Sequence, residues 1–279
     1  MVIPFLKMHG AANDFVVIDH RRPFLPRELG ELVARLCDRR RGIGADGVLL
    51  LEAGSGADAS MRYFNADGGA ADYCGNGARC LARLGLDLGL GHAGRLRLET
   101  AVGVQTARRV GSGIEIEFGY VEAPSEPLRL EACERSFTGR AVRAGVPHFV
   151  VEFEDLKGAA VTEWGRSLRR HPQFGPEGAN VDFVARRGEG VAMRTYVRGV
   201  EGETLACGSG AIATAIWAAS EGLGSPVRVL TSGGDPLIVG FVRRGSGYDV
   251  TLTGPAEVAY RGEWRDTADS VSAVTRGGS

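Results

Sequence analysis

The chain has 279 residues, with 33 basic and 34 acidic side chains and a formal net charge of −1. That balance gives no electrostatic reason to expect a nucleic acid or an anionic membrane surface as a partner. No apolar run approaches the roughly 20 residues of a membrane span, and no signal-peptide pattern opens the chain. Five cysteines are too sparse for a secreted disulfide scaffold, so we expect a cytoplasmic protein of two domains.

The first half of the chain predicts short strands and two helices. Residues 5–8 and 15–19 are strand-like and predict a hairpin around a turn at 9–14. Pro26, placed near a first helical position, predicts a helix over 26–36. The remaining predictions are a turn at 65–69, a helix at 76–86, and strands at 48–52, 61–64, 95–99, 104–108 and 114–118.

The second half repeats this pattern of many strands and two helices. Helices are predicted at 161–170 and 208–221, and strands at 149–153, 181–185, 191–197, 227–230, 237–243 and 248–252. The Pro- and Ser-containing segment 122–127 predicts the boundary between the halves. The polar, Gly- and Ser-containing residues 265–279 predict a loosely held tail.

Two cysteines stand in near-copies of one motif. Cys74 and Cys207 each begin the sequence Cys-Gly-(Asn/Ser)-Gly-Ala, and each precedes an Ala-rich apolar stretch of helical character. A thiolate is favoured at a helix N-terminus because unpaired N–H groups and the helix dipole stabilise negative charge there. The same N–H groups attract a carboxylate, and the glycines allow a ligand to approach the backbone closely.

Two such helix starts that face each other would hold one carboxylate, with one sulfur on each face of the adjoining α-carbon. One thiolate would remove the α-proton and the opposite thiol would deliver a proton to the other face. The N–H groups would stabilise the enolate-like charge of the intermediate. This arrangement predicts racemisation or epimerisation of a small-molecule amino acid.

The residue content favours a mechanism without a cofactor. Pyridoxal phosphate requires a Schiff-base lysine, and the chain has only Lys7 and Lys157, neither of them in a motif of that kind. The histidines and cysteines show no metal-ligand spacing, so no metal site is predicted. Cys37, Cys80 and Cys133 are expected to be structural.

Over nearly its whole length the chain resembles the diaminopimelate epimerase family. The resemblance rests on seven segments taken in this order: 8–15 (MHGAANDF), 42–47 (GIGADG), 64–68 (FNADG), 74–80 (CGNGARC), 145–148 (GVPH), 178–181 (GANV) and 198–211 (RGVEGETLACGSGA). It implies interconversion of L,L- and meso-2,6-diaminopimelate, a step toward lysine and peptidoglycan precursors.

The resemblance also implies an α/β (α+β) fold of two similar domains related by pseudo-twofold symmetry. Each domain would be a barrel-like mixed sheet around a central helix, with the active site in the cleft between the domains. The first domain would cover residues 1–121, joined by the C-terminal segment 263–279, and the second would cover residues 122–262.

Roles for single residues follow from the same resemblance. Cys74 and Cys207 would be the acid/base pair, and His148 would help to set their pKa values. Tyr260 would lie at the interface of a homodimer. The substrate would be bound by backbone N–H groups at Gly75, Asn76, Gly208 and Ser209 and by the side chains of Asn13, Asn65, Asn180 and Arg198.

Three positions depart from the family pattern. Ala12 replaces a glycine, Val146 replaces an asparagine, and Val197 replaces the glutamate of Tyr-Glu-Arg-Gly. In the family, the glutamate at the substrate-binding position 197 would contact the substrate α-ammonium and adjust the pKa values of the two cysteines. Glu201 or Glu203 is a candidate replacement. The alternatives are a racemase of histidine or another diamino acid, a phenazine-type isomerase, and a paralogue that binds an amino acid without turnover.

Overall fold

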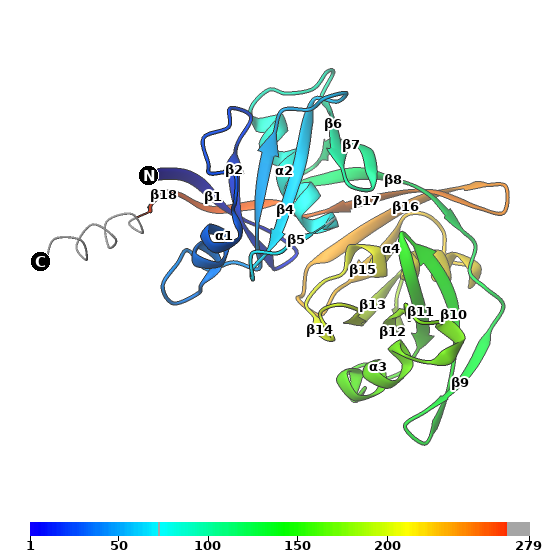
Figure 1. Ribbon diagram of the computed structural model, residues 1–279. Helices are drawn as coiled ribbons and strands as arrows, with labels where there is room; N and C mark the ends of the chain where they lie inside the picture. The colour runs from blue at the N-terminus through cyan, green and yellow to red at the C-terminus, as the bar shows by residue number, and fades with distance from the viewer. Residues whose placement is uncertain (72, 267–279) are drawn as a thin grey trace, which may run out of the picture. The chain divides into compact units, whose positions relative to one another are not determined.

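The structure, a computed structural model, describes residues 1–71 and 73–266 (Figure 1). It has a mixed α/β fold, as the sequence predicts, with many strands and few helices. By its internal contacts the chain forms two compact units. Unit 1 contains residues 1–9, 14–104 and the segment from 257 onward, and unit 2 contains residues 10–13 and 105–256.

Unit 1 is built on strands from both ends of the chain. β1 (Val2–Gly10) pairs antiparallel with β18 (Glu257–Arg265), so that Val2 lies opposite Arg265. The predicted hairpin is confirmed, because β1 pairs with β2. The order continues by hydrogen bonding through β2 (Asn13–Asp19), β3 (Gly47–Glu52), β4 (Ala59–Asn65), β5 (Ala70–Ala71) and β6 (Arg95–Thr100).

Two helices cover apolar strand residues of unit 1. α1 (Gly30–Cys37) buries Leu32, Val33 and Leu36 in the cluster that also contains Ile3 and Val16. α2 (Gly75–Asp87) packs against β3, β4 and β6. The small residues at its start allow this close packing, since a Cβ at Gly77 would lie 3.0 Å from a Leu49 methyl carbon.

Unit 2 is a longer series of paired strands. Most neighbouring strands pair antiparallel, including β12 with β13, and parallel pairs join β11 to β12 and β13 to β15. Its strands are β8 (Gly113–Glu122), β9 (Leu128–Ala132), β10 (Arg135–Ala144), β11 (Val146–Glu152), β12 (Asn180–Arg187), β13 (Gly190–Val197), β14 (Gly202–Thr204), β15 (Val227–Leu230), β16 (Pro236–Arg244) and β17 (Gly247–Gly254). β7 (Gly103–Val110) carries the chain from unit 1 into unit 2.

α4 (Gly208–Ser220) is the central helix of unit 2. Residues 210–218 are all buried, and the helix contacts β10 to β13 and β15 to β17 (Figure 1). A helix that is apolar all round must be surrounded by protein, which explains the Ala- and Ile-rich sequence after Cys207. A second cluster packs α3 (Val161–Arg169) on β12 and β13, and a 3-10 turn, η1 (Pro172–Phe174), follows.

Three sequence predictions need correction. The first helix begins at Gly30 with Leu29 as its N-cap, not at Pro26, and the N–H groups of Phe24 and Leu25 before it are accepted by the Nε2 atom of His20. Strands β5, β9, β10, β14 and β18 are additional to the prediction. Arg265 is not in a loose tail but ends β18, and residues 267–279 lie outside the described part of the chain.

The halves 1–121 and 122–262 stay a prediction. By contacts, residues 105–121 group with unit 2, because β8 pairs with β17 from Gly247↔Glu122 to Gly254↔Ile114. Within residues 1–71 and 73–266, no helix is long and apolar enough to cross a membrane.

Candidate active site

The two motif cysteines adopt the same local conformation. Cys74 is the N-cap of α2 with φ −142° and ψ 117°, and Cys207 is the N-cap of α4 with φ −135° and ψ 115°. An extended N-cap followed by glycines is the usual geometry of a helix start. Both cysteines and the glycines after them are half-buried, and all five cysteines of the chain are thiols.

Cys74 lies in a buried environment within unit 1. Burial raises the pKa of the Cys74 thiol, while the backbone N–H groups of Gly77 and Asn76 and the charge of Arg79 act in the opposite direction. The Oδ1 atom of Asn76 accepts a hydrogen bond of 2.8 Å from the Nη2 atom of the fully buried Arg79. The first turn of α2 therefore directs donors at the sulfur, and the helix buries a cation one turn further on.

The other predicted residues of unit 1 are Asn65 and Tyr260, which lie in strands β4 and β18. Asn65 ends β4 opposite Gly47, and its exposed side chain stands at the predicted turn 65–69. That turn is confirmed by the bond from the Gly68 N–H to the Asn65 carbonyl oxygen, 3.0 Å. Tyr260 lies in β18, is 49% exposed and makes an edge contact with Phe5.

Cys207 is surrounded by polar groups of unit 2. Its Sγ atom accepts the N–H of Gly210 at 3.4 Å and lies 3.4 Å from the Oγ atom of Ser209. The same Oγ atom lies 3.0 Å from Nε2 of His148. Cys207, Ser209 and His148 thus form a continuous hydrogen-bonded series from β11 to the start of α4.

His148 is completely buried and its other ring nitrogen is also bonded. Nδ1 lies 2.7 Å from Oδ2 of Asp182, and Oδ1 of Asp182 accepts the hydroxyl of Thr195 at 2.6 Å. The strand register explains the arrangement, because Asp182 of β12 stands opposite Thr195 of β13. His148 of β11 is opposite Asn180, two residues before Asp182 and so on the same face of the sheet.

Asn180 links His148 to the predicted arginine. Its Oδ1 atom accepts the Arg198 N–H at 2.8 Å, which turns its Nδ2 atom toward Nε2 of His148 at 3.3 Å. The guanidinium of Arg198 is half-buried and lies 3.5 Å from a carboxylate oxygen of Glu177. The structure therefore brings His148, Asn180, Arg198, Ser209, Gly208 and Cys207 together within unit 2.

The remaining predicted residues of unit 2 are Asn13 and Val197. Asn13 begins β2 directly after Ala11 and Ala12, whose φ values of 54° and 62° explain why glycine suits position 12. Val197 ends β13 two residues after Thr195, so its side chain points to the same face of the sheet.

The two proposed substitutes for a glutamate at position 197 are engaged with arginines. Glu203 binds Arg194 through both oxygens at 2.7 Å, and Glu201 binds Arg169 at 2.8 Å. The carboxylate that faces His148 is instead that of Asp182, which the sequence analysis did not single out. Its signal was the alternation Asn180-Val181-Asp182-Phe183, which places two polar residues on one face of an apolar strand.

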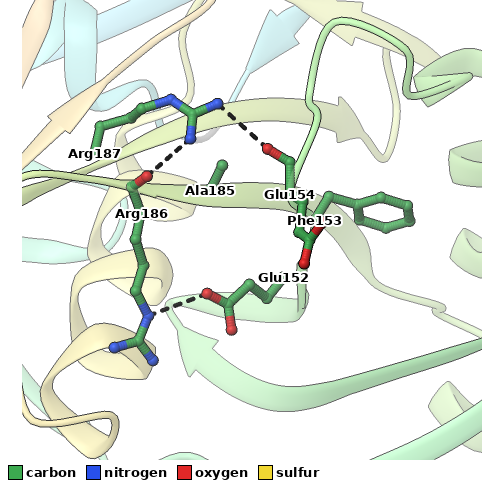
Figure 2. Close-up of a pocket in the computed structure, with 6 residues that line it drawn as sticks. All are labelled: Glu152, Phe153, Glu154, Ala185, Arg186 and Arg187. Carbon is green, nitrogen blue, oxygen red and sulfur yellow. Dashed lines mark hydrogen bonds and ion pairs between the residues drawn. The ribbon is translucent and has the colours of Figure 1, made fainter.

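A separate surface hollow of about 540 Å³ lies at the ends of β11 and β12 and is lined by Glu152, Phe153, Glu154, Ala185, Arg186 and Arg187 (Figure 2). Arg186 is paired with Glu152 at 3.0 Å, and Arg187 donates to backbone oxygens of Arg186 and Glu154 (Figure 2). Because these charges already bind each other, the hollow is a weaker candidate site than the polar network at Cys207.

Solved structures define the class of fold. A phenazine biosynthesis protein of the PhzF family from Bacillus anthracis has a TM-score of 0.70 at 13% identity, covering 95% of this chain and 100% of that chain. A hydroxyproline epimerase from Agrobacterium vitis has a TM-score of 0.61 at 18% identity, covering 94% and 92%. The chain therefore has the fold of these proteins, and the predicted α/β fold class is confirmed.

Sequence comparison defines the family. The family model for diaminopimelate epimerase matches residues 5–121 and 140–257. The diaminopimelate epimerase of Gemmatimonas aurantiaca is 39% identical over 274 residues, covering 93% of this chain and 98% of that protein. That of Halorhodospira halophila is 40% identical over 290 residues, covering 98% of both. The chain belongs to the diaminopimelate epimerase family.

Proposed function

We propose that this chain is an isomerase that interconverts L,L- and meso-2,6-diaminopimelate without a cofactor, with Cys74 and Cys207 as the two acid/base groups. The observation that carries the proposal is the matched pair of helix starts, in which an extended N-cap cysteine precedes α2 and α4. The choice of diaminopimelate as the substrate is supported by relatives named diaminopimelate epimerase, which are 39–40% identical over most of the chain.

The helix starts fit the chemistry that this reaction needs. The N–H groups at Gly75, Gly208 and Ser209, in the first turns of the two helices, can stabilise the carboxylate and the charge that develops on it, and the N–H of Asn76 can act on both this carboxylate and the Cys74 sulfur. One thiolate takes the α-proton, and the other thiol gives a proton to the opposite face. In the reverse direction the two thiols exchange roles.

The second amino-acid end of the substrate requires further polar contacts. Arg198 has a half-exposed guanidinium, and its planar group can bind a carboxylate through two hydrogen bonds. Asn13, Asn65 and Asn180 offer amide donors and acceptors for the ammonium and carboxylate groups. His148 contacts Ser209 beside Cys207 and so acts on the protonation of that thiol.

The function is tested by exchange of the α-hydrogen in heavy water. Purified protein is incubated with L,L-diaminopimelate and, separately, with histidine and other diamino acids, and deuterium uptake at the α-carbon is followed by mass spectrometry. We expect uptake with formation of the meso isomer from diaminopimelate. Exchange with a different amino acid only would refute the substrate, and binding of diaminopimelate without exchange would refute turnover.

We further propose that the enzyme is a cytoplasmic homodimer with Tyr260 at its interface. Tyr260 and Val258 of β18 and Val2 of β1 are 49%, 37% and 49% exposed, and exposed apolar side chains on paired strands are typical of an interaction surface. Light scattering after size-exclusion chromatography should give a dimer for the full chain. Tyr260→Asp should give a monomer, and a monomeric wild-type protein would contradict the proposal.

A further inference from the structure

The polar network of unit 2 connects Cys207 to a buried carboxylate through two intermediate groups. The series runs from Sγ of Cys207 to Oγ of Ser209 at 3.4 Å, and from there to Nε2 of His148 at 3.0 Å. Nδ1 of His148 continues it to Asp182 at 2.7 Å. The structure gives the Ser209 hydroxyl a place between the thiol and the imidazole, in addition to the backbone role expected for Ser209.

The hydrogen bonds determine which way each donor points. The Asp182 carboxylate can only accept when it is ionised, so the proton on Nδ1 of His148 is donated to it. Nε2 then carries the lone pair of the neutral ring. The Nδ2 donor of Asn180 also points at Nε2, and its orientation is fixed by the bond from the Arg198 N–H to Oδ1. Ser209 therefore donates to Nε2 and accepts from the Cys207 thiol.

We propose that the Ser209 hydroxyl relays a proton between the Cys207 thiol and His148, and that Asp182 positions His148 for this transfer. The inference rests on the proposed function for its catalytic meaning. The S–H bond breaks as Oγ of Ser209 takes the proton, and the former O–H proton passes to Nε2 of His148. The products are a thiolate, an intact hydroxyl and an imidazolium, and the reverse transfer restores the thiol.

Local charges stabilise both products of the transfer. The imidazolium formed in the transfer lies 2.7 Å from the Asp182 carboxylate, so its positive charge has a counter-charge in direct contact. The thiolate accepts the Gly210 N–H at the start of α4. The groups that contact His148 come from β12 and α4, and among the described contacts Asp182 is the charged one, while Asn180 and Ser209 are neutral.

Asp182 is held rigidly enough to act as a positioning residue. It is completely buried, and its second oxygen accepts the Thr195 hydroxyl at 2.6 Å. A Cβ at residue 210 would lie 2.7 Å from the same oxygen, so the glycine of the Cys-Gly-Ser-Gly motif leaves room for this carboxylate. Asp182 of β12 thus places a carboxylate on the same face of the sheet as Val197, the position where the family pattern has a glutamate.

The relay is tested by the pH dependence of cysteine alkylation, which needs no substrate. Iodoacetamide reacts with the thiolate, and peptide mass spectrometry reports Cys207 and Cys74 separately in the same molecule. In Ser209→Ala we expect the Cys207 profile to move to higher pH, with alkylation at pH 7 about tenfold slower, as a shift of one pKa unit requires. The limiting rate at high pH should stay the same.

Three comparisons separate the relay from a structural effect. Ser209→Thr keeps a hydroxyl and should restore alkylation of Cys207 at neutral pH. Ser220→Ala is the matched control at the other end of α4, where the hydroxyl bonds only to the Trp217 carbonyl oxygen, and should leave the profile unchanged. The Cys74 profile should be the same in all these variants.

Asp182→Asn should shift the Cys207 profile in the same direction, because an amide cannot stabilise the imidazolium. If this variant does not fold, Thr195→Val removes one bond to Asp182 and should give a smaller shift of the same sign. Superimposable Cys207 profiles in wild type and Ser209→Ala would overturn the relay, even if diaminopimelate is turned over. Equal shifts at Cys74 and Cys207 would also overturn it. The predicted shift without diaminopimelate turnover would retain the relay and refute only the substrate.

Discussion

At the scale of single residues, the two motif cysteines share a backbone conformation but differ in their neighbours. Cys207 contacts the hydroxyl of Ser209, whereas Cys74 receives backbone N–H groups and the field of Arg79. The repeated motif made both cysteines predictable from the sequence, because two thiols at two helix starts have a shared chemical meaning. The polar surroundings of Cys207 depend on how β11, β12 and β13 pair with one another, which the motif around Cys207 does not reveal.

Cys74→Ala and Cys207→Ala should each abolish epimerisation, because each thiol serves one face of the α-carbon. Loss of a general acid or base lowers the rate by about 10²–10⁴-fold, which should place both variants near the limit of a coupled assay. Cys133→Ala is a suitable control, since this half-buried thiol lies in the turn between β9 and β10. Full epimerase activity in Cys74→Ala or in Cys207→Ala would contradict the two-base mechanism.

Lys7 and Asp14 form an ion pair that the sequence analysis did not anticipate. Lys7 Nζ lies 2.6 Å from Asp14, and it also donates to the Gly44 carbonyl oxygen. Burial favours the neutral acid, but the hydrogen bonds from Arg39 and Lys7 prevail and lower the pKa of Asp14 to about 2. Segments 8–15 and 42–47 therefore meet, through Arg39, in a charged cluster that joins β2 to the loop before β3.

Asp14→Asn should destabilise the protein by about 3 kcal/mol at pH 7, since it leaves the ammonium of Lys7 largely buried without its counter-charge. Because the folded pKa of Asp14 is below the unfolded value of about 3.9, its contribution is present above about pH 4 and is lost as the pH falls toward 2. Urea denaturation at pH 7 and pH 3 measures both effects.

The difference between wild type and Asp14→Asn should therefore be smaller at pH 3 than at pH 7. Asp19→Asn is the control, because Asp19 pairs with Arg21 at a partly exposed site where an ion pair contributes at most about 1 kcal/mol. An equal loss of stability in the two variants would contradict the buried ion pair.

At the scale of elements, α2 and α4 could be predicted because a distinctive motif begins each helix. The start of the first helix was predicted less accurately. Proline is common at the first position of a helix, but here α1 begins only at Gly30, after Pro26. β9 and β10 do alternate buried and exposed residues, as in Leu128-Arg129-Leu130-Glu131-Ala132, but the sequence analysis did not use this pattern. β18 is exposed along most of its length, so it carries no such pattern, and its partner β1 lies at the other end of the chain. Strand pairing of this kind is determined by tertiary packing more than by local propensity.

Gly210→Ala tests how closely the start of α4 packs on β12. A methyl group at residue 210 would lie 2.7 Å from the Asp182 oxygen, so the carboxylate or the helix must move. We expect a loss of about 1–3 kcal/mol in stability and a change in the alkylation profile of Cys207. The result is measured by urea denaturation and by iodoacetamide labelling.

Gly208→Ala is the matched control for stability in the same helical turn. Its methyl group would meet only the end of the Leu252 side chain, at 3.2 Å, which can move at little cost. A smaller effect at Gly208 than at Gly210 supports a tight contact between α4 and Asp182. Equal effects would indicate that any side chain in this turn disturbs the helix start.

At the scale of the whole chain, unit 1 is built from segments that are distant in sequence. Residues 1–9 and the segment from 257 onward join residues 14–104, whereas unit 2 is almost continuous. The sequence analysis expects segment 263–279 to join the first half through the family resemblance and not through any local pattern, and that division stays a prediction. β18 supplies this connection by pairing along the full length of β1, and Asp266 adds an ion pair with Arg35 at 2.9 Å.

A chain that ends at residue 256 should therefore lose the structure of unit 1 before that of unit 2. Removal of β18 leaves the backbone of β1 without one partner and exposes apolar residues such as Ile3 and Phe5, which pack in the core of unit 1.

Hydrogen exchange followed by mass spectrometry should show faster exchange in peptides from β1, β2 and α1 of the shortened chain. Peptides from α4 and β12 should keep their protection, because the main contacts of both elements within the described residues are with elements of unit 2. A chain that ends at residue 266 keeps all the described contacts and is the control. Uniform loss of protection in both units of the shorter chain would contradict this division, since it would mean that unit 2 depends on β18 as strongly as unit 1 does.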